Sequence, residues 1–168
     1  MSKILITGAT GFINANLSRK MLKEGHSAYV LLRKQSNLQR IQDVLPDLNV
    51  LEADLLDFET LREGIHKIGP DYIFHSATYG SYPDDQQDED LIVQTNVVGT
   101  YNLLKAANEI SYKCFIYTGS SSEYGFKDKP MAETDLLEPE SLYGVSKASA
   151  TLLCQMFAKR FHKNIQFY

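Results

Sequence analysis

The 168-residue sequence contains no tryptophan, only two cysteines and no long uninterrupted apolar run. A membrane-spanning helix needs about 20 predominantly apolar residues, so the sequence predicts no membrane partner. The formal net charge is −4 at pH 7, and the lack of a basic surplus argues against a nucleic-acid partner. Cys114 and Cys154 stand far apart in apolar segments. This usage predicts two buried thiols in a reduced, cytoplasmic protein, and no metal site.

Strand-like and helical segments alternate along the chain, as they do in the βαβ units of a parallel sheet. We therefore predict an α/β fold with a Rossmann-type, doubly wound parallel sheet. The predicted strands are Ile4–Thr7, Ala28–Leu32, Asn49–Glu52, Tyr72–His75, Lys113–Thr118 and the beginning of a sixth in Asn164–Tyr168. The predicted helices are Ile13–Glu24, Leu38–Leu45, Phe58–Ile68, Leu91–Ile110 and Ser141–His162, with loops over 79–90 and 119–140.

The length and the hydrophobic fraction of 43% suit one domain with a sizeable core. The last predicted strand stops at Tyr168 without a following turn or cap. We expect residues 1–168 to form a single NAD(P)-binding Rossmann domain, truncated before its C-terminal part.

A glycine turn follows the first predicted strand and leads into a helix. Gly8 and Gly11 allow positive φ and let backbone N–H groups approach a pyrophosphate, which the helix N-terminus also attracts. The dinucleotide-binding fingerprint has a third glycine three residues later, where this chain has Asn14. That glycine serves close packing of helix on strand, so its loss weakens the pattern without abolishing it. An ordinary strand-to-helix turn is the alternative interpretation.

The end of the second predicted strand bears on the choice of cofactor. An acidic residue there would bond the adenosine ribose of NAD, whereas a basic residue accommodates the 2′-phosphate of NADP. This chain has Arg33 and Lys34 and no acid, which favours NADP, with NAD still possible; two solvated cations are the alternative. Asp54 is a candidate contact for the adenine edge, although Asp54 or Asp57 could equally cap a helix.

A tyrosine and a lysine share one face of the last predicted helix. Tyr143 precedes Lys147 by four residues, which is about one helical turn. A tyrosine transfers protons poorly near neutral pH unless a cation stabilises its phenolate, and Lys147 can supply that cation and bond a cofactor ribose. A pair of surface residues is the alternative.

Other polar residues gather where strands end at the carboxyl edge of the predicted sheet, the place where open α/β sheets bind ligands. The run 118–125 follows the fifth strand and is rich in serine; one hydroxyl could bond a substrate oxygen, or the run is a polar turn. His75 could relay protons, but a packing histidine is the preferred interpretation. Asn96 is an amide inside an apolar helix and needs hydrogen-bond partners.

Taken together, these motifs resemble the extended short-chain dehydrogenase/reductase family of NAD(P)-dependent nucleotide-sugar epimerases and dehydratases. The matching segments are 7–13, 54–55, 75–77, 95–100, 120–125 and 143–147. They occur in family order over nearly the whole chain, which makes the resemblance specific for the family but not for the reaction.

The resemblance implies a Ser/Thr–Tyr–Lys triad with Tyr143 as acid/base and Lys147 as its electrostatic partner. Aligned on Glu123 the triad hydroxyl is Ser121, and counted back from Tyr124 it is Ser120; we favour Ser121. The implied cofactor-binding residues are Gly8, Thr10, Gly11, Phe12, Ile13, Arg33, Asp54, Leu55, Ser76, Ala77, Asn96, Tyr143 and Lys147.

The resemblance further implies an oxidoreductase, epimerase or dehydratase that transfers a hydride on a nucleotide-sugar, and a homodimer packed through the helices 91–110 and 141–162. The resemblance also implies that residues 1–168 lack the family's C-terminal substrate-binding region. Two alternatives are a non-catalytic dinucleotide-binding regulator or scaffold, and a reductase of a small carbonyl compound.

Overall fold

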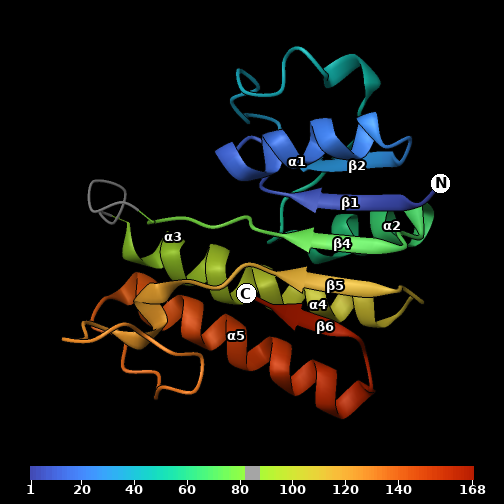
Figure 1. Cartoon of the computed structure of the whole chain (residues 1–168). Coiled ribbons are helices and arrows are strands. Elements are labelled where there is room, and N and C mark those ends of the chain that lie inside the picture. Colours follow the sequence, from blue (N-terminus) through green and yellow to red (C-terminus); the bar gives the residue numbers. More distant parts are fainter. Residues whose placement is uncertain (82–87) are drawn as a thin grey trace.

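The computed structural model describes residues 1–81 and 88–168, and its centre is one six-stranded sheet with every strand pair parallel (Figure 1). The strand order is β3-β2-β1-β4-β5-β6. The strands are β1 (Lys3–Thr7), β2 (Ser27–Leu32), β3 (Asn49–Glu52), β4 (Tyr72–His75), β5 (Cys114–Tyr117) and β6 (Ile165–Phe167). The order reverses between β1 and β4, so the predicted doubly wound Rossmann-type fold is confirmed.

Helices cover both faces of this sheet. They are α1 (Phe12–Lys23), α2 (Phe58–Ile68), α3 (Glu89–Val93), α4 (Gly99–Asn108) and α5 (Leu142–Phe161), with the short turns η1 (Leu45–Asp47), η3 (Gln94–Val98) and η4 (Ser121–Tyr124). No helix in the described part of the chain is long and apolar enough to cross a membrane.

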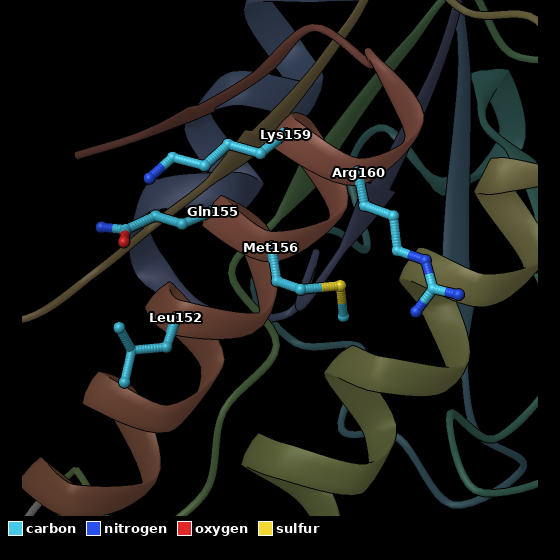
Figure 2. A pocket seen from close by; sticks show the side chains of 5 residues that line it. All are labelled: Leu152, Gln155, Met156, Lys159 and Arg160. Atoms are coloured by element: carbon cyan, nitrogen blue, oxygen red, sulfur yellow. The ribbon is translucent and has the colours of Figure 1, made fainter.

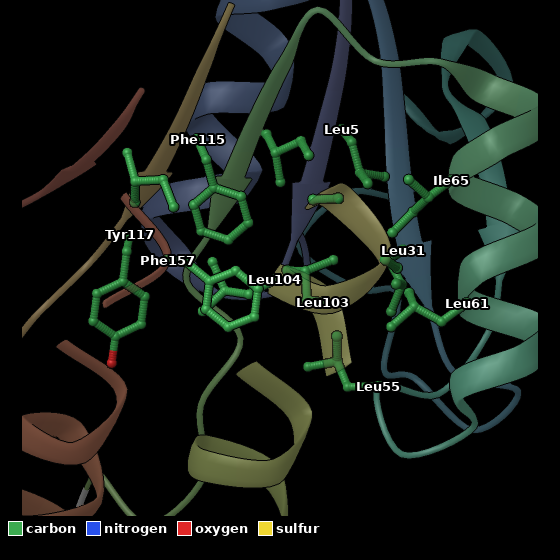
Figure 3. Close-up of a cluster of buried hydrophobic side chains, with 14 of the residues drawn as sticks. Leu5, Leu31, Leu55, Leu61, Ile65, Leu103, Leu104, Phe115, Tyr117 and Phe157 are labelled. Atoms are coloured by element: carbon green, nitrogen blue, oxygen red, sulfur yellow. The ribbon is translucent and has the colours of Figure 1, made fainter. Parts of the chain in front are cut away.

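The core has two layers because alternate residues of a strand point to opposite faces. In β1, Leu5 packs with residues of α2, α4 and α5, whereas Ile4 and Ile6 pack with residues of α1 and of the segment before β3. Figure 3 shows the first of these layers, in which Phe115 of β5 and Phe157 of α5 are labelled among leucine and isoleucine side chains. These two layers hold the carboxyl edge of the sheet in place.

The helix predicted over Leu38–Leu45 is wrong. This segment forms successive turns in which N–H groups bond carbonyls three residues back, as Ile41 does to Leu38 and Val44 to Ile41, before η1 begins. Apolar residues spaced by three satisfy such turns as well as a helix, and Ile41 is fully buried. Pro46 then prevents an α-helix from continuing, since it lacks an N–H group.

The segment 91–110, predicted as one helix, is helical but is divided into α3, η3 and α4. It begins earlier, at Glu89, where the Asp88 side chain accepts the Leu91 N–H, and it contains the π-helical turn η3 between α3 and α4. The predicted loop 79–90 lies partly outside the described residues. The helix predicted over 141–162 is confirmed as α5, with Ser141 as its N-cap and His162 in the left-handed conformation at its end.

Candidate active site

The turn between β1 and α1 leaves the backbone close to a neighbouring strand. Gly8 has φ of +69°, and a Cβ at this position would lie 2.8 Å from the Ala77 nitrogen at the end of β4. Gly11 donates its N–H to the Gly8 carbonyl over 3.0 Å and precedes the first residue of α1. No side chain caps this helix N-terminus, so its first N–H groups are available to an anion.

Asn14 occupies the place of the third fingerprint glycine and is almost fully buried. Its side-chain amide donates a hydrogen bond to the Thr7 carbonyl over 2.7 Å. The asparagine thus replaces close glycine packing with a hydrogen bond between α1 and the end of β1.

A buried chain of hydrogen bonds joins β1, β4 and α4. On one side of the His75 ring, Nδ1 lies 2.7 Å from Thr7 Oγ1, which also accepts the Ala77 N–H over 3.3 Å. On the other side, Nε2 lies 2.8 Å from Thr100 Oγ1, and the Thr100 hydroxyl donates to the Asn96 carbonyl. Complete burial, together with the charge of Lys147, lowers the pKa of His75 to about 3. The ring is therefore neutral. Because the Thr100 hydroxyl proton goes to the Asn96 carbonyl, Nε2 donates to Thr100 and Nδ1 accepts from Thr7.

A cleft of about 390 Å³ opens along the carboxyl edge beside the glycine turn. Eight of the predicted cofactor-binding residues line it: Gly8, Thr10, Gly11, Arg33, Asp54, Leu55, Ser76 and Ala77. Residues that the sequence did not indicate also line it, among them Ser36, Arg40, Thr78, Leu91 and Thr95. Phe12 and Ile13 are largely exposed on the first turn of α1 and are not among its lining residues.

Two arginines are among the residues that line this cleft. Arg33 follows β2, and Arg40 extends from the turns before η1 to place Nη1 3.4 Å from the Thr10 carbonyl. Arg19 of α1 donates a hydrogen bond to the Arg40 carbonyl over 2.7 Å and forms an ion pair with Asp43. Lys34, which the sequence grouped with Arg33, is exposed and does not line the cleft.

Asp54 and Asp57 have different surroundings, and only Asp57 caps a helix. Asp57 is the N-cap of α2, and its carboxylate accepts the Thr60 N–H and hydroxyl. Asp54 lines the cleft, with Oδ1 accepting the Leu56 N–H over 2.9 Å.

Lys147 and Tyr143 lie on the buried face of α5. Lys147 Nζ donates to the Thr118 carbonyl over 2.6 Å and lies 4.3 Å from the centre of the Tyr117 ring. Burial lowers the pKa of Lys147 to about 8. Thr118 also bonds Ser76 in the cofactor cleft, hydroxyl to hydroxyl, over 2.8 Å, so the cleft and Lys147 share one supporting residue.

The serine run forms η4, with Ser120 as its N-cap. Ser120 Oγ accepts the Ser122 N–H, and the Glu123 carboxylate accepts the Ser120 N–H over 2.8 Å. Ser121 is exposed and lines a second cavity of about 800 Å³ between η4, α5 and β6. Ser120 lines the same cavity. The two candidates differ in their surroundings, since Ser120 is half-buried with its hydroxyl accepting a hydrogen bond in the cap, whereas Ser121 is exposed.

Gly144 brings η4 against the beginning of α5. A Cβ at Gly144 would lie 2.5 Å from the Ser122 carbonyl oxygen and 3.1 Å from Pro139 Cβ. The absence of a side chain at Gly144 therefore lets η4 pack next to Tyr143.

Asn96 uses its side chain to join segments of the protein. Its oxygen accepts from the Thr78 hydroxyl and the Tyr79 N–H, and its nitrogen donates to the Tyr79 carbonyl and to Ser146 Oγ. Ser146 in turn donates to the Tyr143 carbonyl over 2.7 Å. All four hydrogen bonds of the amide are thus made within the protein, which makes Asn96 a link between β4 and α5.

No three histidine, cysteine, aspartate or glutamate side chains gather as a metal site would require in residues 1–81 and 88–168. Cys114 and Cys154 are both buried free thiols. Burial raises the pKa of the Cys154 thiol to about 12.

The family model that matches residues 4–167 describes the NAD dependent epimerase/dehydratase family. A curated relative, the dTDP-D-glucose 4,6-dehydratase of Dictyostelium discoideum, is 27% identical over 96% of this chain and 41% of its own length. The chain thus spans about half or less of the length of such relatives.

Solved structures match the same region. The UDP-glucose 4-epimerase of Thermotoga maritima, solved with UDP-glucose, has a TM-score of 0.88 and 25% identity over 98% of this chain and 54% of its own. The UDP-glucuronic acid 4-epimerase of Bacillus cereus, solved with NAD, has a TM-score of 0.84 and 29% identity over 98% of this chain and 55% of its own.

Proposed function

The chain belongs to the NAD dependent epimerase/dehydratase family, and from that premise we propose that residues 1–168 are the cofactor-binding domain of a nucleotide-sugar epimerase, dehydratase or reductase. The observation that supports this most directly is Lys147 of α5, which is buried against Thr118 at the end of β5 and lies one helical turn from Tyr143. A scaffold that only binds a dinucleotide has no need of a tyrosine placed one helical turn from a buried ammonium group for proton transfer, and burying that charge is costly.

The residues of the cleft fit a nicotinamide dinucleotide. The uncapped N-terminus of α1 and the backbone of Gly8 and Gly11 would hold its pyrophosphate. Asp54 would reach the adenine, and Lys147 would bond the ribose nearest the nicotinamide. When bound, the cofactor supplies or accepts a hydride.

Proton transfer falls to Tyr143, with the Lys147 ammonium stabilising its phenolate. Since hydride transfer changes the charge on a substrate oxygen, a hydroxyl beside it is required to hold that oxygen. We assign this role to Ser121: both candidate serines line the larger cavity, but Ser121 is the more exposed and so the more accessible to a substrate. A nucleotide-sugar is the proposed substrate because the relatives' names point to that class.

We propose NADP as the preferred cofactor. Arg33, Ser36 and Arg40 all line the cleft. Guanidinium groups bind phosphate through charge-assisted, paired hydrogen bonds, which suits a 2′-phosphate better than a ribose hydroxyl.

We propose that the protein is a homodimer packed through α4 and α5. Val145, Leu152 and Met156 of α5 are between 38% and 54% exposed, and Figure 2 shows Leu152 and Met156 along the outer side of this helix. Tyr101 of α4 is similarly exposed. A second copy would cover this apolar stripe. The cytoplasmic location remains a prediction from cysteine usage.

The test of this function is the turnover of Tyr143→Phe in the full-length protein, with candidate nucleotide-sugars and NADPH or NADP. We expect a loss of about 100-fold or more, the scale for a positioned acid/base, with cofactor binding retained. Tyr101→Phe on α4 is the matched control and should keep its activity. If Tyr143→Phe keeps more than about half of the turnover while chemistry limits the rate, the proposal fails.

A further inference from the structure

Glu123 is a carboxylate enclosed by the protein, with 3% of its surface exposed. Its Oε1 accepts the Ser120 N–H in the cap of η4. An uncharged side chain with an oxygen acceptor could make the same hydrogen bond. A buried negative charge is costly without an opposite charge nearby, so the cap alone does not account for the charge.

The opposite charge belongs to Lys147, which is also 3% exposed. The turn 118–120 holds both groups: the Thr118 carbonyl accepts from Lys147 Nζ, and the Ser120 N–H donates to Glu123. A Cβ at Gly119, between them, would lie 3.0 Å from Glu123 Oε1. In the part of the chain that the structure describes no direct ion pair joins the two charges, but both side chains bond this same turn.

We propose that Glu123 is the buried counter-ion of Lys147 and thereby a positioning residue for the reaction, an inference that rests on the proposed function of Lys147. The carboxylate holds the lysine in its charged form. Only the charged lysine can stabilise a phenolate at Tyr143, so the cap of η4 and the proton-transfer pair act as one unit.

The other groups facing Lys147 cannot serve as this counter-ion. His75 of β4 is neutral because burial lowers its pKa to about 3. Burial raises the pKa of Tyr117 on β5, and it raises that of Cys154 on α5 to about 12, so both stay protonated near neutral pH. Tyr143, on α5 itself, is the proton-transfer group that the lysine serves.

The sign of the effect follows from these charges. Burial lowers the pKa of Lys147 to about 8, and the negative charge of Glu123 opposes that decrease. Neutralising Glu123 therefore lowers the pKa of Lys147 further, and the lysine loses its proton at a lower pH.

The experiment is an NMR titration of the Lys147 ¹³Cε signal in the full-length protein and in Glu123→Gln, which keeps an oxygen acceptor for the cap. We expect the pKa of Lys147 to fall by about one unit, the lower range for an opposite charge. Glu133→Gln is the matched control, since Glu133 is exposed and lines the same cavity; it should leave the pKa unchanged. An unchanged pKa in Glu123→Gln overturns the inference.

A second measurement covers the case in which Glu123→Gln does not fold. In the unaltered protein, the Glu123 ¹³Cδ signal should shift at the pH where Lys147 titrates, and a flat signal there overturns the inference. Turnover of Lys147→Met separates the two proposals: retained activity refutes the proposed function, whereas the titrations test the counter-ion alone.

Discussion

The side chain of Asn14 donates a hydrogen bond to the carbonyl of Thr7 over 2.7 Å, in the interior between α1 and β1. Close packing at this place in the fingerprint normally depends on glycine. The asparagine instead fills this space and joins α1 to β1 by a hydrogen bond. Replacing it with the usual glycine should therefore lower the stability of this protein.

We predict that Asn14→Gly lowers the free energy of unfolding by about 1.5–3 kcal/mol, since a buried hydrogen bond is lost and glycine weakens the helix. Urea denaturation of both proteins measures the difference. Asn16→Gly, on the exposed side of the same helix, is the control and should cost at most about 1 kcal/mol. Equal losses in the two variants would mean that the Asn14 bond contributes nothing.

The parallel sheet, the glycine turn and the helix that bears Tyr143 and Lys147 could be predicted from the sequence. Each of these depends on local patterns, namely β-branched apolar runs, glycines at a strand end and one helical turn of spacing. The burial of Lys147 was not predictable, because it depends on how Thr118 and Tyr117 of a distant segment pack against α5.

The segment before β3 was misread for a physical reason. Leu38, Ile41 and Val44 recur every three residues, and this spacing fits both a helix and a series of tight turns. Because of this error the sequence did not indicate Arg40. Its position at the cleft depends on those turns and on the hydrogen bond that Arg19 donates to its carbonyl. The π-helical turn η3 left no trace in the sequence, since one extra residue in a turn barely alters an apolar pattern.

The buried neutral His75 predicts acid sensitivity. Its pKa is about 3 in the folded protein and about 6.5 when unfolded, so below pH 6.5 the unfolded state binds a proton that the folded state excludes. Stability is therefore lost as the pH falls from 6.5, by at most about 1.4 kcal/mol per unit.

Urea denaturation between pH 4.5 and 7 measures this dependence. His75→Gln should show a shallower slope by about that amount, whatever its stability at neutral pH. His66→Gln, which removes an exposed histidine of α2, should keep the steep slope. Equal slopes for His75→Gln and the unaltered protein would contradict a His75 ring that stays neutral in the folded state.

The arginines at the cleft predict the cofactor preference. The full-length protein should bind NADPH more tightly than NADH by about 1.5–3 kcal/mol, the range for a charge-assisted contact. Arg33→Ala should erase the preference and Arg40→Ala should reduce it, because both arginines line the cleft. Fluorescence titration with both cofactors provides the measurement.

Lys34→Ala is the matched control, because Lys34 adjoins Arg33 in sequence but does not line the cleft. It should leave the preference intact. Equal affinity for the two cofactors in the unaltered protein, or tighter binding of NADH, would overturn the assignment of NADP.

The exposed stripe of α5 predicts a dimer interface. Leu152→Glu combined with Met156→Glu should convert the full-length protein from dimer to monomer at micromolar concentration, because two buried charges at each copy's interface lack partners. Sedimentation velocity distinguishes the two species. Leu136→Glu, in the exposed loop before α5, should stay dimeric, and a monomeric unaltered protein would refute the interface.

Gly144 offers the sharpest test of how the site is assembled. Alanine favours a helix, so Gly144→Ala should not weaken α5 itself. Its methyl group, however, would lie 2.5 Å from the Ser122 carbonyl, and η4 must then move away from the beginning of α5. Because the reacting groups tolerate little displacement, turnover should fall by about 10-fold or more while circular dichroism remains that of the folded protein. Val145→Ala, the exposed neighbour, should keep its activity. If Gly144→Ala turns over normally, the serine turn and Tyr143 do not depend on their close packing, and the assignment of Ser121 to the reaction loses its structural basis.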